Sequence, residues 1–150
     1  MSNYQLAQIN VARLVAPLDT PEIEEFVAAL DPVNASADRA AGFVWRLQAD
    51  DGNATSVRAF DDPLVIVNLT VWESIEALES FVFCDDGHKA VLRRRRDWFE
   101  RPTEAHTALW WVPAGTTPTV AEAAARLVHL REHGASETAF TFRERFAPSL

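Results

Sequence analysis

The sequence has a single cysteine, Cys84, among its 150 residues. One cysteine excludes an intramolecular disulfide and a metal site built from several cysteines, and it is typical of a protein in the reducing cytoplasm. An unpaired cysteine on a helix usually packs as a small apolar side chain. We therefore expect Cys84 to be buried and not to act as a nucleophile.

The chain also lacks an excess of positive charge, since its formal net charge is −8. Nucleic acids and anionic membranes bind basic surfaces, so neither is an expected partner. Residues 1–5 lack the basic and apolar segments of a signal peptide, and no apolar run approaches the length of a membrane span. These absences predict a soluble, cytoplasmic protein.

Several motifs of catalysis are missing as well. We find no glycine-rich phosphate loop, no nucleophile elbow and no paired carboxylates in a recognisable context, which disfavours nucleotide-dependent and hydrolytic functions. There is no repeat, linker or low-complexity segment. At 48% hydrophobic residues, the sequence is typical of one domain, residues 1–150, with a sizeable core.

The pattern of apolar residues predicts a regular alternation of strands and helices. Strands are expected over residues 4–14, 43–48, 64–72, 108–112 and 139–146, with a short edge strand within 54–63. Helices are expected from Thr20 to a break at Asp31–Pro32, from Ser74 to Phe83, from His88 to Phe99, and from Thr119 to Gly134. Residues 33–41 add one or two helical turns.

This order of elements defines the expected fold. The sequence β, α, β, β, α, β is that of the ferredoxin-like split βαβ, an α+β fold with helices on one face of an antiparallel sheet, here followed by a C-terminal helix and strand. In that fold the first and third strands are central neighbours. The uncovered sheet face usually finds a partner, so we expect a homodimer.

Polar side chains interrupt the two central strands at positions where core is expected. Gln8 and Asn10 share one face of the first strand, and Asn68, Thr70 and Trp72 share one face of the third. Buried amides are costly unless they are paired. Convergence of these groups beside an aromatic ring predicts a mainly apolar pocket for a small hydrophobic or aromatic molecule.

Several strings of residues resemble a known family. They are Leu6-Ala7-Gln8-Ile9-Asn10, Gly42-Phe43-Val44-Trp45-Arg46-Leu47, Val71-Trp72-Glu73-Ser74, Arg96-Asp97-Trp98-Phe99 and Leu109-Trp110-Trp111-Val112-Pro113-Ala114-Gly115. Together they resemble the domain-of-unknown-function family DUF3291, in the dimeric α/β-barrel superfamily that includes antibiotic biosynthesis monooxygenases. The resemblance covers nearly the whole chain.

The resemblance implies a function and a small set of catalytic residues. Asn68 and Trp72 are similar to an asparagine and a tryptophan, four residues apart, of cofactor-independent monooxygenases that oxidise polycyclic aromatic substrates. In that interpretation Asn68 holds a substrate carbonyl or enolate, Trp72 forms an apolar wall, and the substrate donates electrons to oxygen without a cofactor. Oxygenation, or cyclisation and isomerisation, of an aromatic or polyketide-like molecule is the implied chemistry.

Two alternatives stay open. A haem-binding or haem-degrading branch of the superfamily uses a helix histidine as axial ligand, a role that His88 would fill. A second alternative is a binding protein that uses the pocket without chemistry. No other metal site is expected, although His129 and His133 lie one helical turn apart.

The remaining candidates for lining the pocket are aromatic or cationic side chains. Either Arg93 or Arg96 is suited to meet a carboxylate or phenolate, and Arg46 competes for that role. Core packing is the simpler explanation for any single tryptophan, and Trp110 and Trp111 point to opposite faces, so at most one of them lines a given pocket. The predicted substrate-binding set is Gln8, Asn10, Trp45, Arg46, Thr70, Phe81, Arg93, Trp98 and Trp110.

Overall fold

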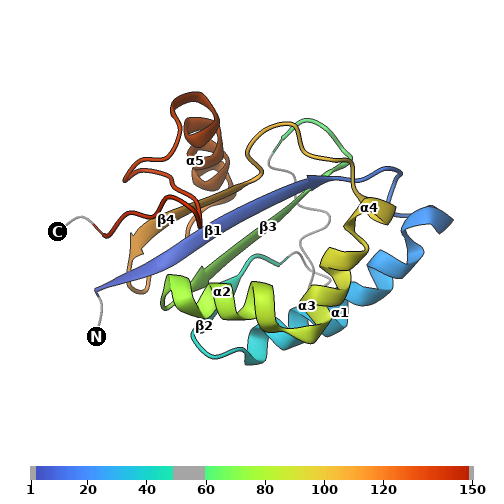
Figure 1. The fold of residues 1–150 in the computed structure, drawn as a ribbon, viewed down its shortest axis with the longest axis horizontal. Coiled ribbons are helices and arrows are strands. Elements are labelled where there is room, and N and C mark those ends of the chain that lie inside the picture. The colour runs from blue at the N-terminus through green and yellow to red at the C-terminus, as the bar shows by residue number, and fades with distance from the viewer. Residues whose placement is uncertain (1–2, 49–59, 149–150) are drawn as a thin grey trace.

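The computed structural model describes residues 3–48 and 60–148, which contain a four-stranded antiparallel sheet in the order β2-β3-β1-β4 (Figure 1). The strands are β1 (Tyr4–Arg13), β2 (Phe43–Arg46), β3 (Val65–Trp72) and β4 (Thr107–Pro113). β1 pairs with β3 and with β4, and β2 pairs with β3. The predicted ferredoxin-like order, with the first and third strands as central neighbours, is confirmed.

Helices cover both faces of this sheet (Figure 1). The 3-10 turn η1 (Pro21–Ile23) leads into α1 (Glu24–Arg39), and α2 (Ile75–Cys84), α3 (Asp86–Arg93) and α4 (Arg95–Trp98) follow β3. These helices lie on one side of the sheet, whereas α5 (Val120–His133) lies on the other.

Side-chain caps fix where three helices begin. The Ser74 hydroxyl accepts a hydrogen bond from the Ala77 N–H at 3.1 Å, and Thr119 does the same for Glu122 at 3.1 Å. Both caps lie at the residues where these helices are predicted to begin. At the predicted interruption, the Asp85 carboxylate accepts from the His88 N–H at 2.9 Å and starts α3. Gly134, at φ 76°, ends α5 as expected.

The predicted break at Asp31–Pro32 is wrong, because α1 continues through Pro32 to Arg39. Proline removes one helical N–H and leaves the carbonyl four residues earlier, that of Ala28, without its partner. Ala28 and Pro32 are both exposed, so water can satisfy that carbonyl. The helix packs through Phe26 and Ala37, which are buried on either side of the proline.

The predicted strand at 139–146 is reduced to a single bridge, in which Phe140 and Leu109 exchange two backbone hydrogen bonds at the edge of β4. Phe140 is wholly buried. The second strand ends at Arg46, short of the predicted Gln48. Most of the edge strand expected within 54–63 lies outside the described residues, and residues 60–63 form no strand.

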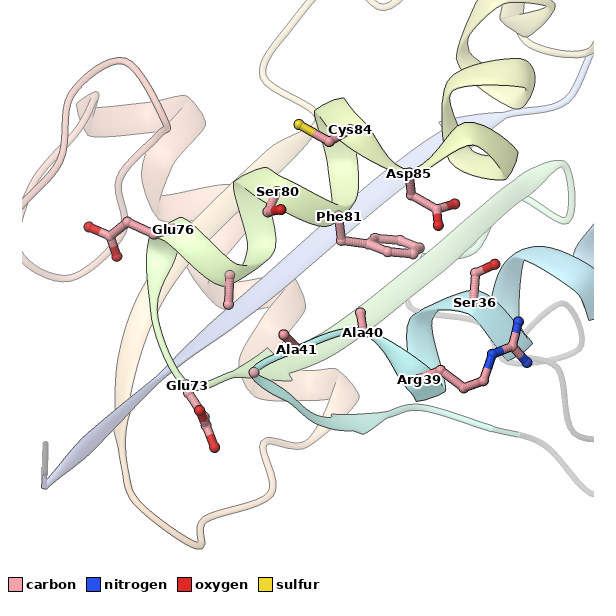
Figure 2. A pocket seen from close by; sticks show the side chains of 12 residues that line it. Ser36, Arg39, Ala40, Ala41, Glu73, Glu76, Ser80, Phe81, Cys84 and Asp85 are labelled. Atoms are coloured by element: carbon pink, nitrogen blue, oxygen red, sulfur yellow. The ribbon is translucent and has the colours of Figure 1, made fainter.

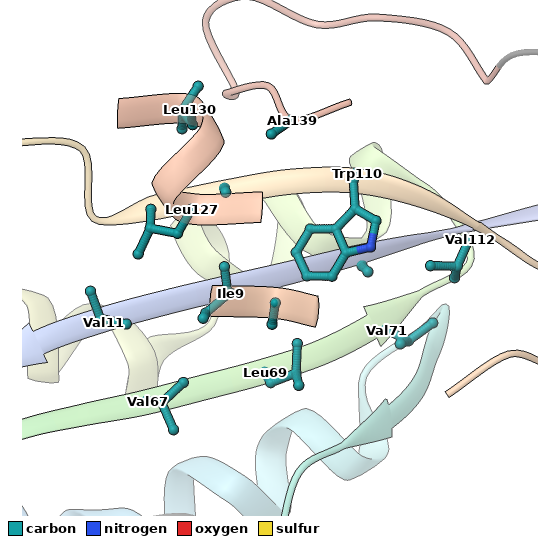
Figure 3. Close-up of a cluster of buried hydrophobic side chains, with 13 residues drawn as sticks. Ile9, Val11, Val67, Leu69, Val71, Trp110, Val112, Leu127, Leu130 and Ala139 are labelled. Carbon is teal, nitrogen blue, oxygen red and sulfur yellow. The ribbon is translucent and has the colours of Figure 1, made fainter. Parts of the chain in front are cut away.

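The two faces of the sheet belong to different cores. The face under α5, here called the α5 face, carries Ala7, Ile9, Val11, Val67, Leu69, Val71, Ala108, Trp110 and Val112, packed against Ala123, Leu127 and Leu130 (Figure 3). The opposite face, here called the α2 face, carries Leu6, Gln8, Asn10, Asn68, Thr70, Trp72, Thr107, Leu109 and Trp111. A third cluster joins Leu14 to Ile23, Phe26 and Trp98.

The position of α5 changes the argument for a homodimer. We expected the second sheet face to be uncovered and to pair with another copy. Instead α5 of the same chain buries Ile9, Leu69 and Trp110 completely. The homodimer stays a prediction, but its original reason, an open sheet face, is wrong.

Candidate functional site

The polar residues of β1 and β3 lie side by side on the α2 face, as predicted. In the register of the two strands Gln8 is opposite Thr70, Asn10 is opposite Asn68, and Leu6 is opposite Trp72. Antiparallel partners present their side chains on the same face. Two successive polar pairs therefore cross the centre of the sheet on the α2 face.

Three of these side chains form a buried hydrogen-bonded chain. The Trp72 indole Nε1–H donates to the Thr70 Oγ1 at 2.9 Å, and the Thr70 hydroxyl donates to the Gln8 Oε1 at 2.8 Å. Gln8 is 7% exposed and Thr70 is 5% exposed. The Trp72 and Thr70 donors are both satisfied, which removes much of the cost of burying these groups. The chain also fixes the orientation of the Trp72 ring.

The two asparagines differ in how they are used. Asn10 is half-buried, and its Nδ2 donates to the Thr107 Oγ1 at 2.7 Å. Asn68 is exposed and makes no side-chain hydrogen bond within the described part of the chain. Its amide is therefore available to a ligand, whereas Gln8 and Asn10 are held by threonines. Sequence reasoning missed Thr107, because the fourth strand was predicted to start one residue later.

An aromatic row continues from Trp72 toward α3. The Trp72 ring contacts Phe43 edge-on, with centroids 5.4 Å apart, and Phe81 at 5.5 Å. Phe81 in turn contacts the His88 ring at 5.2 Å. Phe81 thus joins two predicted catalytic residues, Trp72 on β3 and His88 on α3, that lie on different elements.

His88 is held in one tautomer by the backbone. Its Nδ1 lies 2.9 Å from the Val82 carbonyl oxygen. A carbonyl only accepts, so Nδ1 carries the hydrogen and Nε2 carries a lone pair when the ring is neutral. Burial lowers the pKa of His88, and this outweighs the Val82 carbonyl and the Asp85 charge, which raise it. The neutral ring is therefore the form favoured at neutral pH.

Arg46 reaches the α2 face through a bulge in β2. The register of β2 against β3 shifts between Phe43 and Trp45, so that Phe43 is opposite Trp72 and Arg46 is opposite Thr70. The bulge lets residues three apart share a face. Arg46 binds Asp38 of α1 through two nitrogens at 2.8 and 3.3 Å, and its side chain is 12% exposed. Its charge is largely neutralised by this pair.

Other predicted residues lie elsewhere. Trp45 and Trp110 belong to the α5 face, because they are opposite Val71 and Ala7, so the sheet separates them from Asn68. Trp111, not Trp110, is the tryptophan of β4 on the α2 face. Trp98 packs with Phe26 at 5.5 Å in the third cluster. Arg93 is exposed on α3.

An open groove lies beside this site, between the end of α1 and α2 (Figure 2). Its volume is about 730 Å³, and small side chains line it where Gly42 approaches α2. Gly42 has φ +81°, and a Cβ there would lie 2.5 Å from the Ala77 Cβ, so no larger residue fits. The groove meets the predicted site at Phe81. Its other lining residues are Ser36, Arg39, Ala40, Ala41, Glu73, Glu76, Ser80, Cys84 and Asp85.

Cys84 is exposed, so the expectation that it is buried is wrong. It is the last residue of α2, and its thiol lies on the side of that helix away from the Phe81 ring (Figure 2). Among the described residues, no group of three or more histidine, cysteine or acidic side chains is arranged to hold a metal ion. No helix in the described ranges is long and apolar enough to cross a membrane.

A four-stranded antiparallel sheet with this topology makes the protein a ferredoxin-like α+β domain. The chain belongs to the family described as "Domain of unknown function (DUF3291)", whose profile matches residues 5–150. The resemblance drawn from sequence strings is thereby confirmed. The sequence matches none of the curated proteins with which it was compared.

Solved structures share the fold at low sequence identity. A Pseudomonas aeruginosa protein is 15% identical with a TM-score of 0.50, and the match covers 77% of this chain and 98% of that one. SnoaB, a cofactor-independent oxygenase from Streptomyces nogalater, is 17% identical with a TM-score of 0.48, covering 75% of this chain and 95% of that one. A putative antibiotic biosynthesis monooxygenase from Nitrosomonas europaea is 14% identical with a TM-score of 0.48, covering 77% of this chain and 93% of that one.

Proposed function

We propose that this protein binds a small aromatic or polyketide-like molecule on the α2 face and catalyses its cofactor-independent oxygenation, or its cyclisation or isomerisation. The observation that carries the proposal is the contrast among the polar side chains. Gln8, Thr70 and Trp72 are buried and hydrogen-bonded to one another, whereas the Asn68 amide beside them is exposed and unpaired within the described residues.

In this proposal Asn68 donates its amide hydrogens to a substrate carbonyl. Deprotonation of a carbon conjugated with that carbonyl gives an enolate, whose negative oxygen accepts more strongly than the carbonyl does. Hydrogen bonds that strengthen as charge develops lower the barrier, because they favour the intermediate over the bound substrate. The buried chain from Gln8 to Trp72 keeps the neighbouring aromatic wall in a fixed orientation.

His88 supplies the base. Its neutral ring, with Nδ1–H bound to the Val82 carbonyl, leaves the Nε2 lone pair to take the proton. For an anthrone, the enolate then reacts with O₂. The ring CH₂ becomes a carbonyl, one oxygen atom enters the product, and the other leaves as water with the two hydrogens. The substrate supplies all the electrons, so no cofactor is needed.

The test uses purified protein and a panel of hydroxylated anthrones, with oxygen uptake as the readout. We expect uptake by the wild type, and a loss of roughly 10²-fold in Asn68→Ala, the size seen when one donor to a developing oxyanion is removed. Asn3→Ala is the matched control, because Asn3 is an exposed amide outside the site. Uptake that is unchanged in Asn68→Ala and in Trp72→Phe would refute this site.

Two alternatives are separated by binding measurements. A binding protein without chemistry would hold the same anthrones with an affinity that depends on Asn68 and would show no oxygen uptake. A haem protein would use the His88 Nε2 as iron ligand, since Nδ1 is engaged with Val82. Haem titration would then give a Soret band that disappears in His88→Ala.

The homodimer is kept as part of the proposal. Because α5 covers the α5 face, a second copy would contact a different surface. Sedimentation velocity gives the oligomeric state directly, and a monomer at all concentrations would refute this part without affecting the site.

A further inference from the structure

Phe81 lies between the open groove and the buried polar chain. On one side it lines the groove together with Ala40 and Ala77. On the other side these three side chains pack against the cluster that contains Trp72. The Phe81 ring is 5.5 Å from the Trp72 ring and 5.2 Å from the His88 ring. Figure 2 shows the ring lying across the space between α2 and α1.

We infer that the groove between α1 and α2 is the outer part of the ligand site, and that the Phe81 side chain separates it from the inner part at Trp72. This inference rests on the function proposed above. A flat ring that displaces Phe81 would reach the Trp72 face directly. Phe81 is half-buried and lies in the last turn of α2, which ends at Cys84, so its ring packs at the edge of the cluster that contains Trp72 and not in its interior.

The residues of the groove define the chemistry of the ligand. Its floor is apolar, formed by Ala40, Ala77 and Phe81, and it accepts an aromatic ring. Its edge carries three carboxylates, Glu73, Glu76 and Asp85, against the single guanidinium of Arg39. A negative edge disfavours anions. The ligand class is therefore an uncharged or cationic aromatic molecule, such as a neutral polycyclic phenol, and not an aromatic carboxylate.

The experiment follows indole N–H signals by NMR in the full chain. Five tryptophans give five such signals, and the one from Trp72 is identified by its disappearance in Trp72→Phe. The probe is 2-naphthol. We expect 2-naphthol to shift the Trp72 signal and the Ala77 backbone signal together, because the ligand spans the groove and the inner site.

Two variants that add an aromatic ring test whether the ligand enters through the groove. Ser80 is exposed at the edge of the groove, and Ser80→Tyr should raise the Kd of 2-naphthol at least tenfold by filling that space. Ala125→Tyr, at an exposed position of α5, is the matched control and should leave the Kd unchanged. Phe81→Ala removes the partition and should speed association at least threefold.

The failures are distinguishable. If Ser80→Tyr binds 2-naphthol as the wild type does, with the Trp72 signal still shifting, the ligand arrives by another route and this inference is wrong while the proposed function stands. If the Ala77 signal shifts and the Trp72 signal does not, the groove is a separate site and the inference is again wrong. If neither shifts with any aromatic probe, the inference and the proposed function both fail.

A second arm tests the charge preference with 2-naphthylmethylammonium and 2-naphthoate. Exposed charges near a ligand change affinity modestly, so the cation should bind up to about fivefold more tightly than the anion. The double variant Glu73→Gln, Glu76→Gln should bring the ratio close to one. Equal binding of the two probes to the wild type would overturn the assigned ligand class.

Discussion

The two faces of one sheet differ sharply in chemistry. The α5 face is apolar along all three of its long strands, from Ala7 to Val112, and it is sealed by Leu127 and Leu130. The α2 face, formed by alternate residues of the same strands, carries Gln8, Asn10, Asn68, Thr70 and Thr107. The contrast teaches that one face serves stability, and that the other gives up apolar burial for hydrogen-bonded polar side chains, where we propose that a ligand binds.

The largest expected effect is a loss of stability from a cavity in the apolar α5 face. Leu69 is wholly buried under α5, so Leu69→Ala should lower the free energy of unfolding by about 2–5 kcal/mol through lost burial and a cavity. Val128, 38% exposed on the outer side of α5, is the control, and Val128→Ala should change stability by less than about 0.5 kcal/mol. Urea denaturation measures both. Equal losses in the two variants would contradict the assigned core.

The next largest effect is a loss of stability when the hydrogen-bonded chain on the α2 face is interrupted. Thr70→Val keeps the shape but leaves the Trp72 N–H and the Gln8 carbonyl oxygen without partners, which should cost about 1–3 kcal/mol. Adding Gln8→Leu removes one of these orphaned groups and should recover part of the loss. A double-mutant cycle from urea denaturation gives the coupling energy. Strict additivity would show that the chain does not act as a unit.

A smaller effect is expected on the pH dependence of stability, through the titration of His88. Burial lowers the pKa of His88 below its usual 6.5, so the unfolded state binds the proton more tightly than the folded state. The stability from this group is therefore complete above about pH 6.5 and is lost as the pH falls toward the folded pKa. His88→Asn keeps a donor toward Val82 but cannot titrate, and should flatten the stability curve between pH 7 and 5.

His106 titrates in the same direction, because burial and the Arg131 charge lower its pKa. His106→Asn is therefore the control that separates the two histidines. A curve in which His88→Asn matches the wild type across this pH range would show that His88 is not buried as described.

The smallest expected effect on stability belongs to the residue with the largest expected role in function. Asn68 is exposed and unpaired within the described residues, so Asn68→Ala should change the free energy of unfolding by less than about 0.5 kcal/mol. Binding of an uncharged phenol should weaken by about 2- to 10-fold, the value of one hydrogen bond. Calorimetric titration checks the binding, and a large loss of stability would instead indicate a structural role.

Much of the fold could be predicted from local signals. The β-branched run that predicts the strand at 64–72, the Ser74 and Thr119 caps and the Gly134 stop all act within a few residues of the chain, and the structure confirms these elements. The helix break predicted at Pro32 is wrong because the effect of a proline depends on whether the freed carbonyl is exposed, which the sequence does not record. Trp45 and Trp110 were predicted to line the pocket but lie on the α5 face. Which face a strand residue occupies depends on the register between strands, and a shift of one residue reverses it.

The candidate site was predicted only in part. Period-two alternation alone placed Gln8, Asn10, Asn68, Thr70 and Trp72 on one face, and the pairing of β1 with β3 brought them together. The contacts from Trp72 through Phe81 to His88 join two elements that no spacing in the sequence links. The same holds for the pairing of Asn10 with Thr107.

By itself, the sequence determined the family, the order of strands and helices, and the polar character of one face, because each depends on residue identity and local periodicity. Only the tertiary structure decided that α5 covers the opposite face of the sheet. It also decided that threonines hydrogen-bond the amides of Gln8 and Asn10, and that the Asn68 amide is exposed. Those outcomes depend on which distant side chains compete for the same space and the same hydrogen bonds, and such competition exists only once the chain has folded.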